Sequence, residues 1–173
     1  MDVITMPERE LTLEEMLSIL ELVPEISIDE VLDIHERELS ELPPKERDIR
    51  LCIETQLRKL IEDIHKRELP NTPFRKCDVL ILYDVSVATL THEEGKIYEC
   101  VYEEKLEPDY SIIALHPKLP IRPFFYAVAE HLLYEKLNYI PDYKVIRMIG
   151  KNLLKKYKKQ FKSIINECRR LYV

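Results

Sequence analysis

The sequence predicts an α+β fold with an N-terminal helical subdomain, a small three-stranded antiparallel sheet, a buried central helix and a long C-terminal amphipathic helix. Three observations support this prediction. Apolar residues recur at helical spacing between residues 12 and 69. Between residues 79 and 115 the pattern changes to short apolar or alternating runs, which are typical of strands. Helical spacing returns from residue 120 to residue 171.

Length and composition indicate one compact body. With 173 residues, 46% of them hydrophobic, the chain can bury a single sizeable core. We expect a helical region over residues 1–70 and the α+β part, which ends in a basic helix, over residues 71–173. Only 2 glycines are present, which argues against the glycine-rich phosphate-binding loops of nucleotide-binding folds. Charged residues make up 34% and are rich in Glu and Lys, a usage typical of heat-adapted proteins, so we expect a thermophilic source.

The sequence contains no sign of export or membrane insertion. No apolar run approaches the roughly 20 residues that cross a bilayer, and the N-terminus lacks the basic and apolar regions of a signal peptide. We therefore expect a cytoplasmic protein without a membrane partner. The cysteines, which form no C-x-x-C pair, are predicted to be buried thiols, with one disulfide as the alternative in a hyperthermophile. They are Cys52, Cys77, Cys100 and Cys168.

Three helices are expected in the N-terminal region. The first spans residues 12–22 and begins with a capping box, in which Thr12 and Glu15 satisfy backbone amides of the first turn. The second follows Ser27 and ends before two consecutive prolines. The third spans residues 44–69 and carries apolar residues at helical spacing.

A short repeat links the last two of these helices. Residues 33–39 and 63–69 share the pattern Asp-Ile-His-x-Arg-Glu-Leu, with His35 and His65 at equivalent positions. Two copies are too few for a solenoid. We interpret the repeat as the similar C-terminal turns of two amphipathic helices, and the alternative is a paired histidine and acid site that arose by duplication.

Strands and then helices are expected in the second half. Residues 79–85 and 111–115 form apolar runs, and residues 96–103 alternate. Because Pro108 and Asp109 favour a turn, the second and third strands are predicted to pair as an antiparallel hairpin. The next segments are a central helix, apolar on more than one side, and a long helix with one apolar face and one lysine-rich face. They span residues 120–138 and 142–171.

This arrangement of short strands and a buried helix carrying Glu130 resembles the core of SprT-like and IrrE-like zincin metallopeptidases over residues 77–140. In that family two histidines of an H-E-x-x-H helix bind zinc, and the glutamate takes a proton from the metal-bound water. Here Ala129 and Leu133 stand at the two histidine positions and have no lone pair to donate. The resemblance therefore implies a degenerate zincin-like core, a pseudoenzyme in which Glu130 is a relic of the general base.

A displaced metal site is an alternative on the same helix. His131 and Glu135 are four residues apart on one helical face, and His116 follows the adjacent strand. These three side chains are chemically suited to zinc, which would make the protein a metal-dependent hydrolase with a non-standard site. The other interpretation is a surface pair of His131 and Glu135, with His116 capping a loop. We expect no cofactor.

Charge is distributed unevenly along the chain. Residues 1–65 hold 18 acidic and 7 basic residues, residues 66–143 hold 13 and 9, and residues 144–173 hold 1 and 10, which gives net charges of −11, −4 and +9. The C-terminal helix is therefore predicted either to bind nucleic acid or to complement the acidic front half, within the chain or between subunits. The candidate phosphate-binding residues are Lys151, Lys155, Lys156, Lys158, Lys159, Lys162, Arg169 and Arg170.

Motifs for nucleophilic catalysis are absent from the sequence. There is no G-x-S-x-G, and no cysteine belongs to a motif that contains histidine. We therefore expect a non-catalytic interaction or regulatory protein on a degenerate metallopeptidase-like scaffold, from a mobile element of a thermophile. Its expected partner is another protein or a second copy of the chain. Nucleic-acid binding and metal-dependent hydrolysis are the alternatives.

Overall fold

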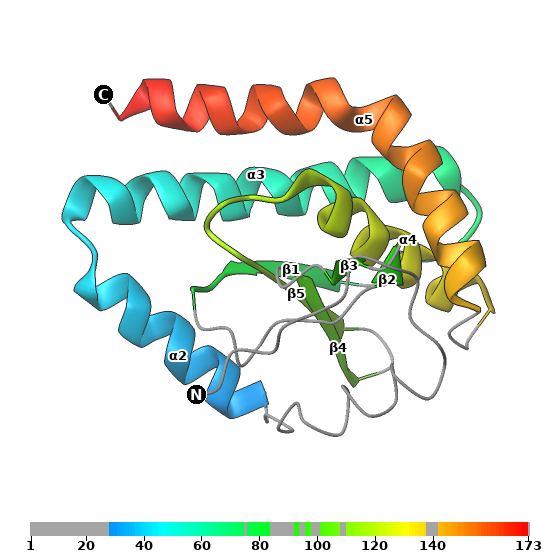
Figure 1. Ribbon diagram of the computed structural model, residues 1–173, viewed down its shortest axis with the longest axis horizontal. Helices are drawn as coiled ribbons and strands as arrows, with labels where there is room; N and C mark the ends of the chain where they lie inside the picture. The colour runs from blue at the N-terminus through cyan, green and yellow to red at the C-terminus, as the bar shows by residue number, and fades with distance from the viewer. Residues whose placement is uncertain are drawn as a thin grey trace.

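The computed structural model describes residues 28–74, 76–83, 92–93, 96–97, 101–107, 110–137 and 142–172. Within these residues the helices are α2 (Ile28–Glu41), α3 (Pro44–Glu68), α4 (Ile121–Leu137) and α5 (Tyr143–Leu171). The strands are β1 (Lys76–Ile81), β2 (His92–Glu93), β3 (Lys96–Ile97), β4 (Val101–Glu107) and β5 (Tyr110–Leu115). The helix expected after Ser27 is present as α2 (Figure 1), whereas the one expected at residues 12–22 lies outside the described residues.

The main sheet is mixed. Its strands lie in the order β1, β5, β4. β1 runs parallel to β5, with Lys76 opposite Tyr110 and Ile81 opposite Leu115, whereas β4 runs antiparallel to β5. The predicted α+β fold with a three-stranded antiparallel sheet is therefore wrong, because the described part of the chain is helix-rich and its sheet contains a parallel pair. The hairpin expected between the second and third strands is present as β4 and β5. The bounds expected for the second strand, residues 96–103, are wrong, because residues 96–97 form β3, which pairs with β2, and β4 spans Val101–Glu107.

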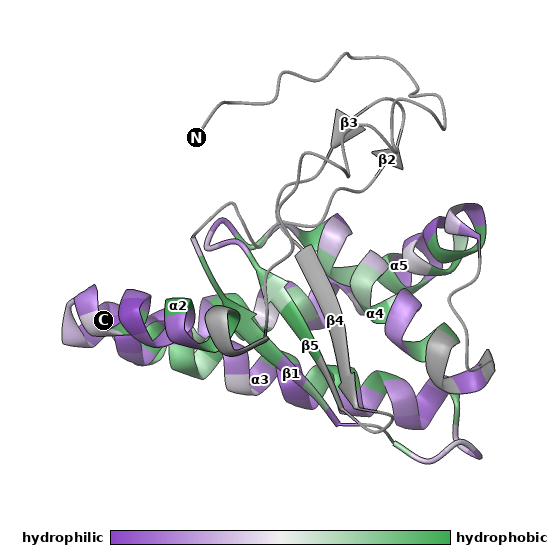
Figure 2. Ribbon diagram, turned by 90° about the horizontal axis from the view of Figure 1, so that it is seen from below, coloured by the Kyte–Doolittle hydropathy of each residue, from purple (hydrophilic) through white to green (hydrophobic). Residues whose placement is uncertain are grey.

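Both faces of the parallel pair are buried. Val79 and Ile113 belong to the core on one side of the sheet, whereas Leu80 and Ile112 belong to the cluster on the other side. Strands covered on both faces read as near-continuous apolar runs, which is usual for parallel strands. β1 and β5 have such runs, and Figure 2 shows both strands as largely hydrophobic. The local turn pattern contains no information about this longer-range pairing.

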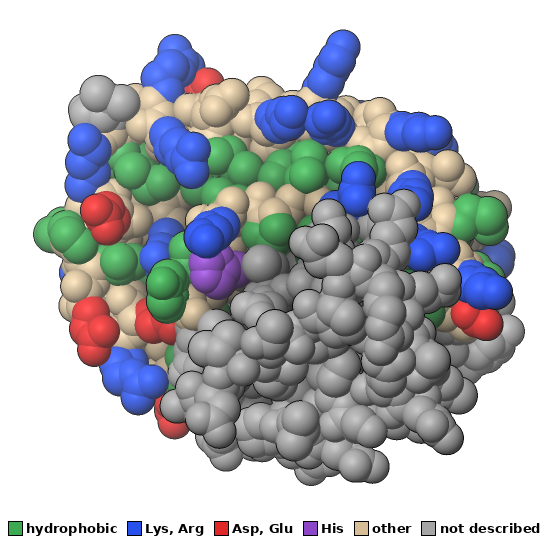
Figure 3. Space-filling view, in the orientation of Figure 1, with side chains coloured by type: hydrophobic (Ala, Val, Ile, Leu, Met, Phe, Trp, Pro, Cys, Tyr) green, Lys and Arg blue, Asp and Glu red, His purple; other side chains and the backbone are tan. Residues whose placement is uncertain are grey.

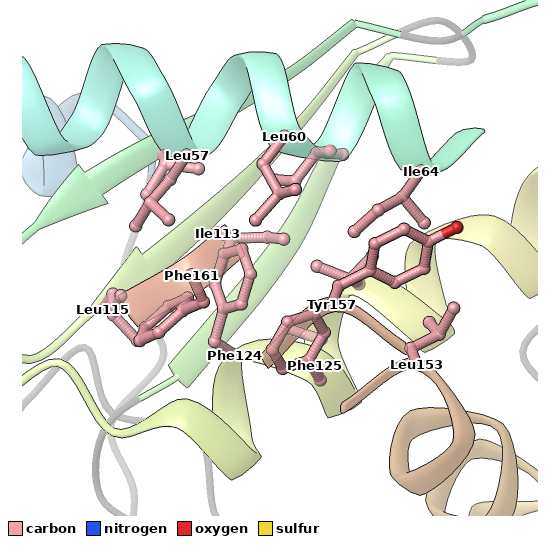
Figure 4. Close-up of a cluster of buried hydrophobic side chains, with 14 of the residues drawn as sticks. Leu57, Leu60, Ile64, Ile113, Leu115, Phe124, Phe125, Leu153, Tyr157 and Phe161 are labelled. Atoms are coloured by element: carbon pink, nitrogen blue, oxygen red, sulfur yellow. The ribbon is translucent and has the colours of Figure 1, made fainter. Parts of the chain in front are cut away.

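The larger hydrophobic core fills the space between α3, α4, α5 and one face of the sheet (Figure 4). Phe124 and Phe125 of α4 are fully buried. The ring of Phe161 from α5 packs on both, with centroid distances of 5.1 and 5.9 Å. The central helix expected at residues 120–138 is therefore present and buried. The smaller cluster packs α2 against the other face through Val31, Leu80, Leu82, Ile112 and Ala114.

Local signals position the starts of the two long helices. α3 begins at Pro44, whose missing N–H would be unpaired in the first turn of any helix. The side chain of Asp142 caps α5 by accepting a hydrogen bond from the backbone N–H of Lys144 at 2.8 Å. The helices predicted at residues 44–69 and 142–171 are confirmed.

A disulfide joins α3 and α5. Cys52 and Cys168 are bonded, with Cα atoms 5.8 Å apart and a sequence separation of 116 residues. The prediction of buried thiols is therefore wrong for these two cysteines, because α5 returns alongside α3 and brings them together (Figure 1). Cys77 is buried in β1 outside the disulfide, and Cys100 lies outside the described residues.

Gly150 of α5 packs against Tyr126 of α4, and we expect Gly150→Ala to destabilise the protein. A Cβ atom at this position would lie 2.4 Å from Cδ1 and 3.2 Å from Cα of Tyr126, which is itself buried. Overpacking of this kind lowers the unfolding free energy by about 1–3 kcal/mol, as measured by urea denaturation. Ser163→Ala, on the exposed face of α5, is the control and should change it by less than about 0.5 kcal/mol. Stabilisation by Gly150→Ala, as helix propensity alone predicts, would contradict the close packing.

Candidate nucleic-acid interface

The packing of α5 determines which of its residues face outward. Leu153, Tyr157, Phe161 and Ile165 are buried at four-residue intervals and hold one side of the helix against α3 and α4. The opposite side is exposed. Because 3.6 residues make one turn, the lysines between these apolar positions are directed away from the core.

Five exposed basic residues form what we call the basic row, and Figure 3 shows Lys and Arg side chains gathered along α5. Over residues 155–162, members of the row that are three or four residues apart lie about 5–6 Å from each other on one helical face. Arg169 lies about two helical turns beyond Lys162. At 1.5 Å per residue, the row extends over about 21 Å. Its members are Lys155, Lys158, Lys159, Lys162 and Arg169.

Three predicted phosphate-binding residues do not belong to the row, because Lys151 is half-buried and Lys156 and Arg170 are paired with acids. Lys156 Nζ lies 3.0 and 3.3 Å from the two carboxyl oxygens of Glu68, and Arg170 pairs with Glu167. Tyr157 also donates a hydrogen bond to Glu68 at 3.0 Å. Burial and this hydrogen bond raise the pKa of Tyr157 above its usual value, which keeps the phenol protonated.

The basic row is not neutralised within the described part of the chain. Among the ion pairs between described residues, only that of Lys156 with Glu68 joins α5 to the N-terminal helices, and none includes a residue of the row. The acidic helix α2 lies on the far side of α3 from α5 in Figure 1. Within the described part of the front half, which begins at residue 28, the predicted docking on the basic helix accounts for one lysine, Lys156.

A shallow groove of about 500 Å³ between α3 and α5 adjoins the basic row. Lys59 and Asp63 of α3 and Lys159 of the basic row line it, together with the apolar residues Leu60 and Ile164. Figure 3 shows a strip of hydrophobic side chains with basic side chains beside it. Sequence reasoning missed Lys59, because the position of a single exposed lysine on α3 gives no indication that α5 lies next to it.

No protein-family model, curated protein or solved structure matches this chain. The resemblance of residues 77–140 to zincin metallopeptidases therefore stays a prediction.

The residues considered for zinc lie on β5 and α4. His116 follows β5, where its Nδ1 accepts a hydrogen bond from the N–H of Lys118 at 3.0 Å, and His131 is fully buried in α4. The side chain of Glu135 lies outside the described residues. The described residues contain no group of three or more His, Cys, Asp or Glu side chains suited to a metal ion.

The proposed relic of a general base also lies on α4. Glu130 is half-buried there, Ala129 is fully buried and Leu133 is half-buried. The two positions that bind zinc in the resembled family thus carry hydrocarbon side chains, which cannot bind a cation. The role of Glu130 and the zinc set of His116, His131 and Glu135 stay predictions.

A buried polar cluster fastens α2 to α3 and to the end of β1. His35 Nε2 lies 2.7 Å from Glu54 Oε2, and the same oxygen accepts the backbone N–H of Ile81 at 2.8 Å. In addition, Glu38 accepts the N–H of Tyr83 at 2.6 Å. Each of these acids satisfies a backbone donor at or just beyond the end of β1, which is a structural role.

Proposed function

We propose that the protein binds nucleic acid through the basic row of α5. The observation that carries this proposal is the exposure of Lys155, Lys158, Lys159, Lys162 and Arg169 along one face without an ion pair to any described residue. Phosphate groups are the anions that such a face fits best, because each neutralised phosphate releases condensed counterions. The net charge of −6 does not oppose this, since the local field of the +9 C-terminal segment orients the encounter.

The salt dependence of binding tests this proposal. If all five residues of the row contact phosphates, the slope of log K against log salt concentration should be about −4.5 for a duplex. Affinity should then fall by about 500-fold between 50 and 200 mM salt. The measurement is fluorescence anisotropy of a labelled duplex of about 24 base pairs, with polyglutamate as a competitor. No binding at 50 mM salt, or equal competition by polyglutamate, would overturn the proposal.

Charge reversal in the basic row should weaken this binding. Lys158→Glu together with Lys162→Glu removes two phosphate contacts, so we expect a loss of about 60-fold at 100 mM salt and a salt slope shallower by about 2. Arg37→Glu with Lys45→Glu makes the same charge change at exposed positions of α2 and α3 and is the matched control. Equal losses from both pairs would show that net charge, and not the row, determines binding.

A second candidate function is self-association, which the exposed apolar residues at the disulfide-linked end of the molecule favour. Leu51 and Leu171 are 41% and 64% exposed. Both lie within three residues of a disulfide-bonded cysteine, so they share one end of the molecule. We propose a second copy of the chain as the partner at this end. Sedimentation should show a dimer that Leu171→Glu disrupts and that Met148→Glu, at an equally exposed site near the start of α5, leaves intact.

We also propose a heat-adapted source with the protein in the cytoplasm. Among the described residues, no helix combines the length and the apolar content that crossing a bilayer requires. Disulfides are rare in the cytoplasm of most organisms but are found there in hyperthermophiles. The Cys52–Cys168 disulfide and a cytoplasmic location are therefore compatible if the source is heat-adapted. A melting temperature above about 90 °C would support this, and one below about 65 °C would contradict it.

A further inference from the structure

We propose that the ligand of the basic row is double-stranded, and that it is held through its phosphates without stacking of its bases on aromatic side chains. This inference rests on the proposed nucleic-acid binding. It adds the class of nucleic acid, duplex or single strand, which we infer from the burial of the aromatic side chains next to the lysines of α5.

The aromatic residues within the basic segment of α5 are not available for stacking. Proteins that bind single strands combine a basic groove with exposed aromatic rings on which successive bases stack. Tyr157 and Phe161 lie within the basic segment but are only 4% and 2% exposed. Tyr157 is held by Glu68, and Phe161 is packed on two phenylalanines of α4. Both rings therefore belong to the core.

Tyr172 is an exposed aromatic residue next to the row. It is 38% exposed and directly follows α5, three residues beyond Arg169. A single ring at one end provides no platform for successive bases. Substitution of Tyr172 nevertheless gives a direct test, because binding would depend on this ring if bases stacked on it.

The length and spacing of the basic row fit a rigid duplex. A row of about 21 Å on one helix corresponds to about six base pairs at 3.4 Å per step. Double-stranded DNA presents one charge per about 1.7 Å of its axis, so several phosphates come within reach of the row without deformation of the ligand. A flexible single strand would have to be ordered along the row, and no stacking contact would offset that loss of entropy.

Counterion release gives the size of the expected preference for duplex over single strand. Each phosphate contact contributes about −0.9 to the salt slope for B-form duplex and about −0.7 for a single strand. Five contacts therefore give slopes of about −4.5 and −3.5, which correspond to about tenfold tighter duplex binding at 100 mM salt.

The test compares a duplex of about 24 base pairs with each of its separate strands, without reductant, by anisotropy from 50 to 200 mM salt. At least about tenfold tighter duplex binding, weakened by Lys158→Glu with Lys162→Glu and unchanged in Tyr172→Ala, would support the inference. Equal or tighter single-strand binding that the same charge reversal weakens would overturn it and leave the proposed function standing. A loss of tenfold or more in Tyr172→Ala would also overturn it. Absence of binding to all three nucleic acids would overturn the proposed function itself.

Discussion

Breaking the Cys52–Cys168 disulfide is expected to lower the free energy of unfolding by about 4–5 kcal/mol. The bond closes a loop with a sequence separation of 116 residues. Loops of this length lose the most conformational entropy when they are closed in the unfolded chain. The bond also joins the C-terminal end of α5 to α3, beside the last residues of the basic row. Its loss should therefore increase opening of the last turns of α5 as well as global unfolding.

Urea denaturation with and without reductant measures this effect. Cys52→Ala with Cys168→Ala is the matched variant, and its stability should equal that of the reduced wild type and not respond to reductant. Amide hydrogen exchange of residues 160–171 should increase more than that of α4. A change of less than about 1 kcal/mol on reduction, or equal sensitivity of the variant to reductant, would show that the bond does not stabilise the fold.

The helices were predictable because each one is encoded locally. Apolar residues at a period of 3.6 set the face of α5, and Asp142 and Pro44 mark the starts of two helices next to the residues that they cap. The parallel pairing of β1 with β5 was not predictable in this way. It joins Lys76 to Tyr110, and which strands become neighbours depends on the path of the whole chain.

The repeated segments of α2 and α3 also show that local sequence does not determine the tertiary contacts of single residues. His35 and His65 stand in almost identical local sequences. The first meets Glu54, whereas the second bonds the carbonyl of Thr72 at 2.7 Å in the loop after α3. The two histidines therefore have different partners, a carboxylate for His35 and a backbone carbonyl for His65. What each side chain contacts is decided by tertiary packing, which the repeat does not encode.

The candidate site was predictable in part for a similar reason. Composition and helical spacing indicated a basic face on α5. They did not indicate that Lys156 would form an ion pair with Glu68, or that Lys59 of α3 would lie next to the basic row. Likewise, the spacing of the cysteines gave no sign of the disulfide, because Cys52 and Cys168 meet only when α5 lies along α3.

Removal of the Glu54 carboxyl group is expected to cost about 3–5 kcal/mol of unfolding free energy, because it breaks a buried pair and leaves its partners behind. Glu54 and His35 are 3% and 9% exposed, and one carboxyl oxygen bonds both the imidazole of His35 and the N–H of Ile81. In Glu54→Leu both donors lose their acceptor in a buried site. Because this oxygen connects α2, α3 and β1, its loss should loosen the attachment of α2 in particular.

Urea denaturation of three variants distinguishes the effect of losing the His35–Glu54 contact from the effect of losing packing alone. Glu54→Gln keeps an acceptor oxygen for Ile81 and should lose only about 1–2 kcal/mol. The double variant His35→Leu with Glu54→Leu should lose less than the sum of its single changes, since both partners of the contact are then hydrocarbon. A loss below about 1 kcal/mol in Glu54→Leu, or strictly additive losses in the double variant, would show that the contact between α2 and α3 does not depend on this pair.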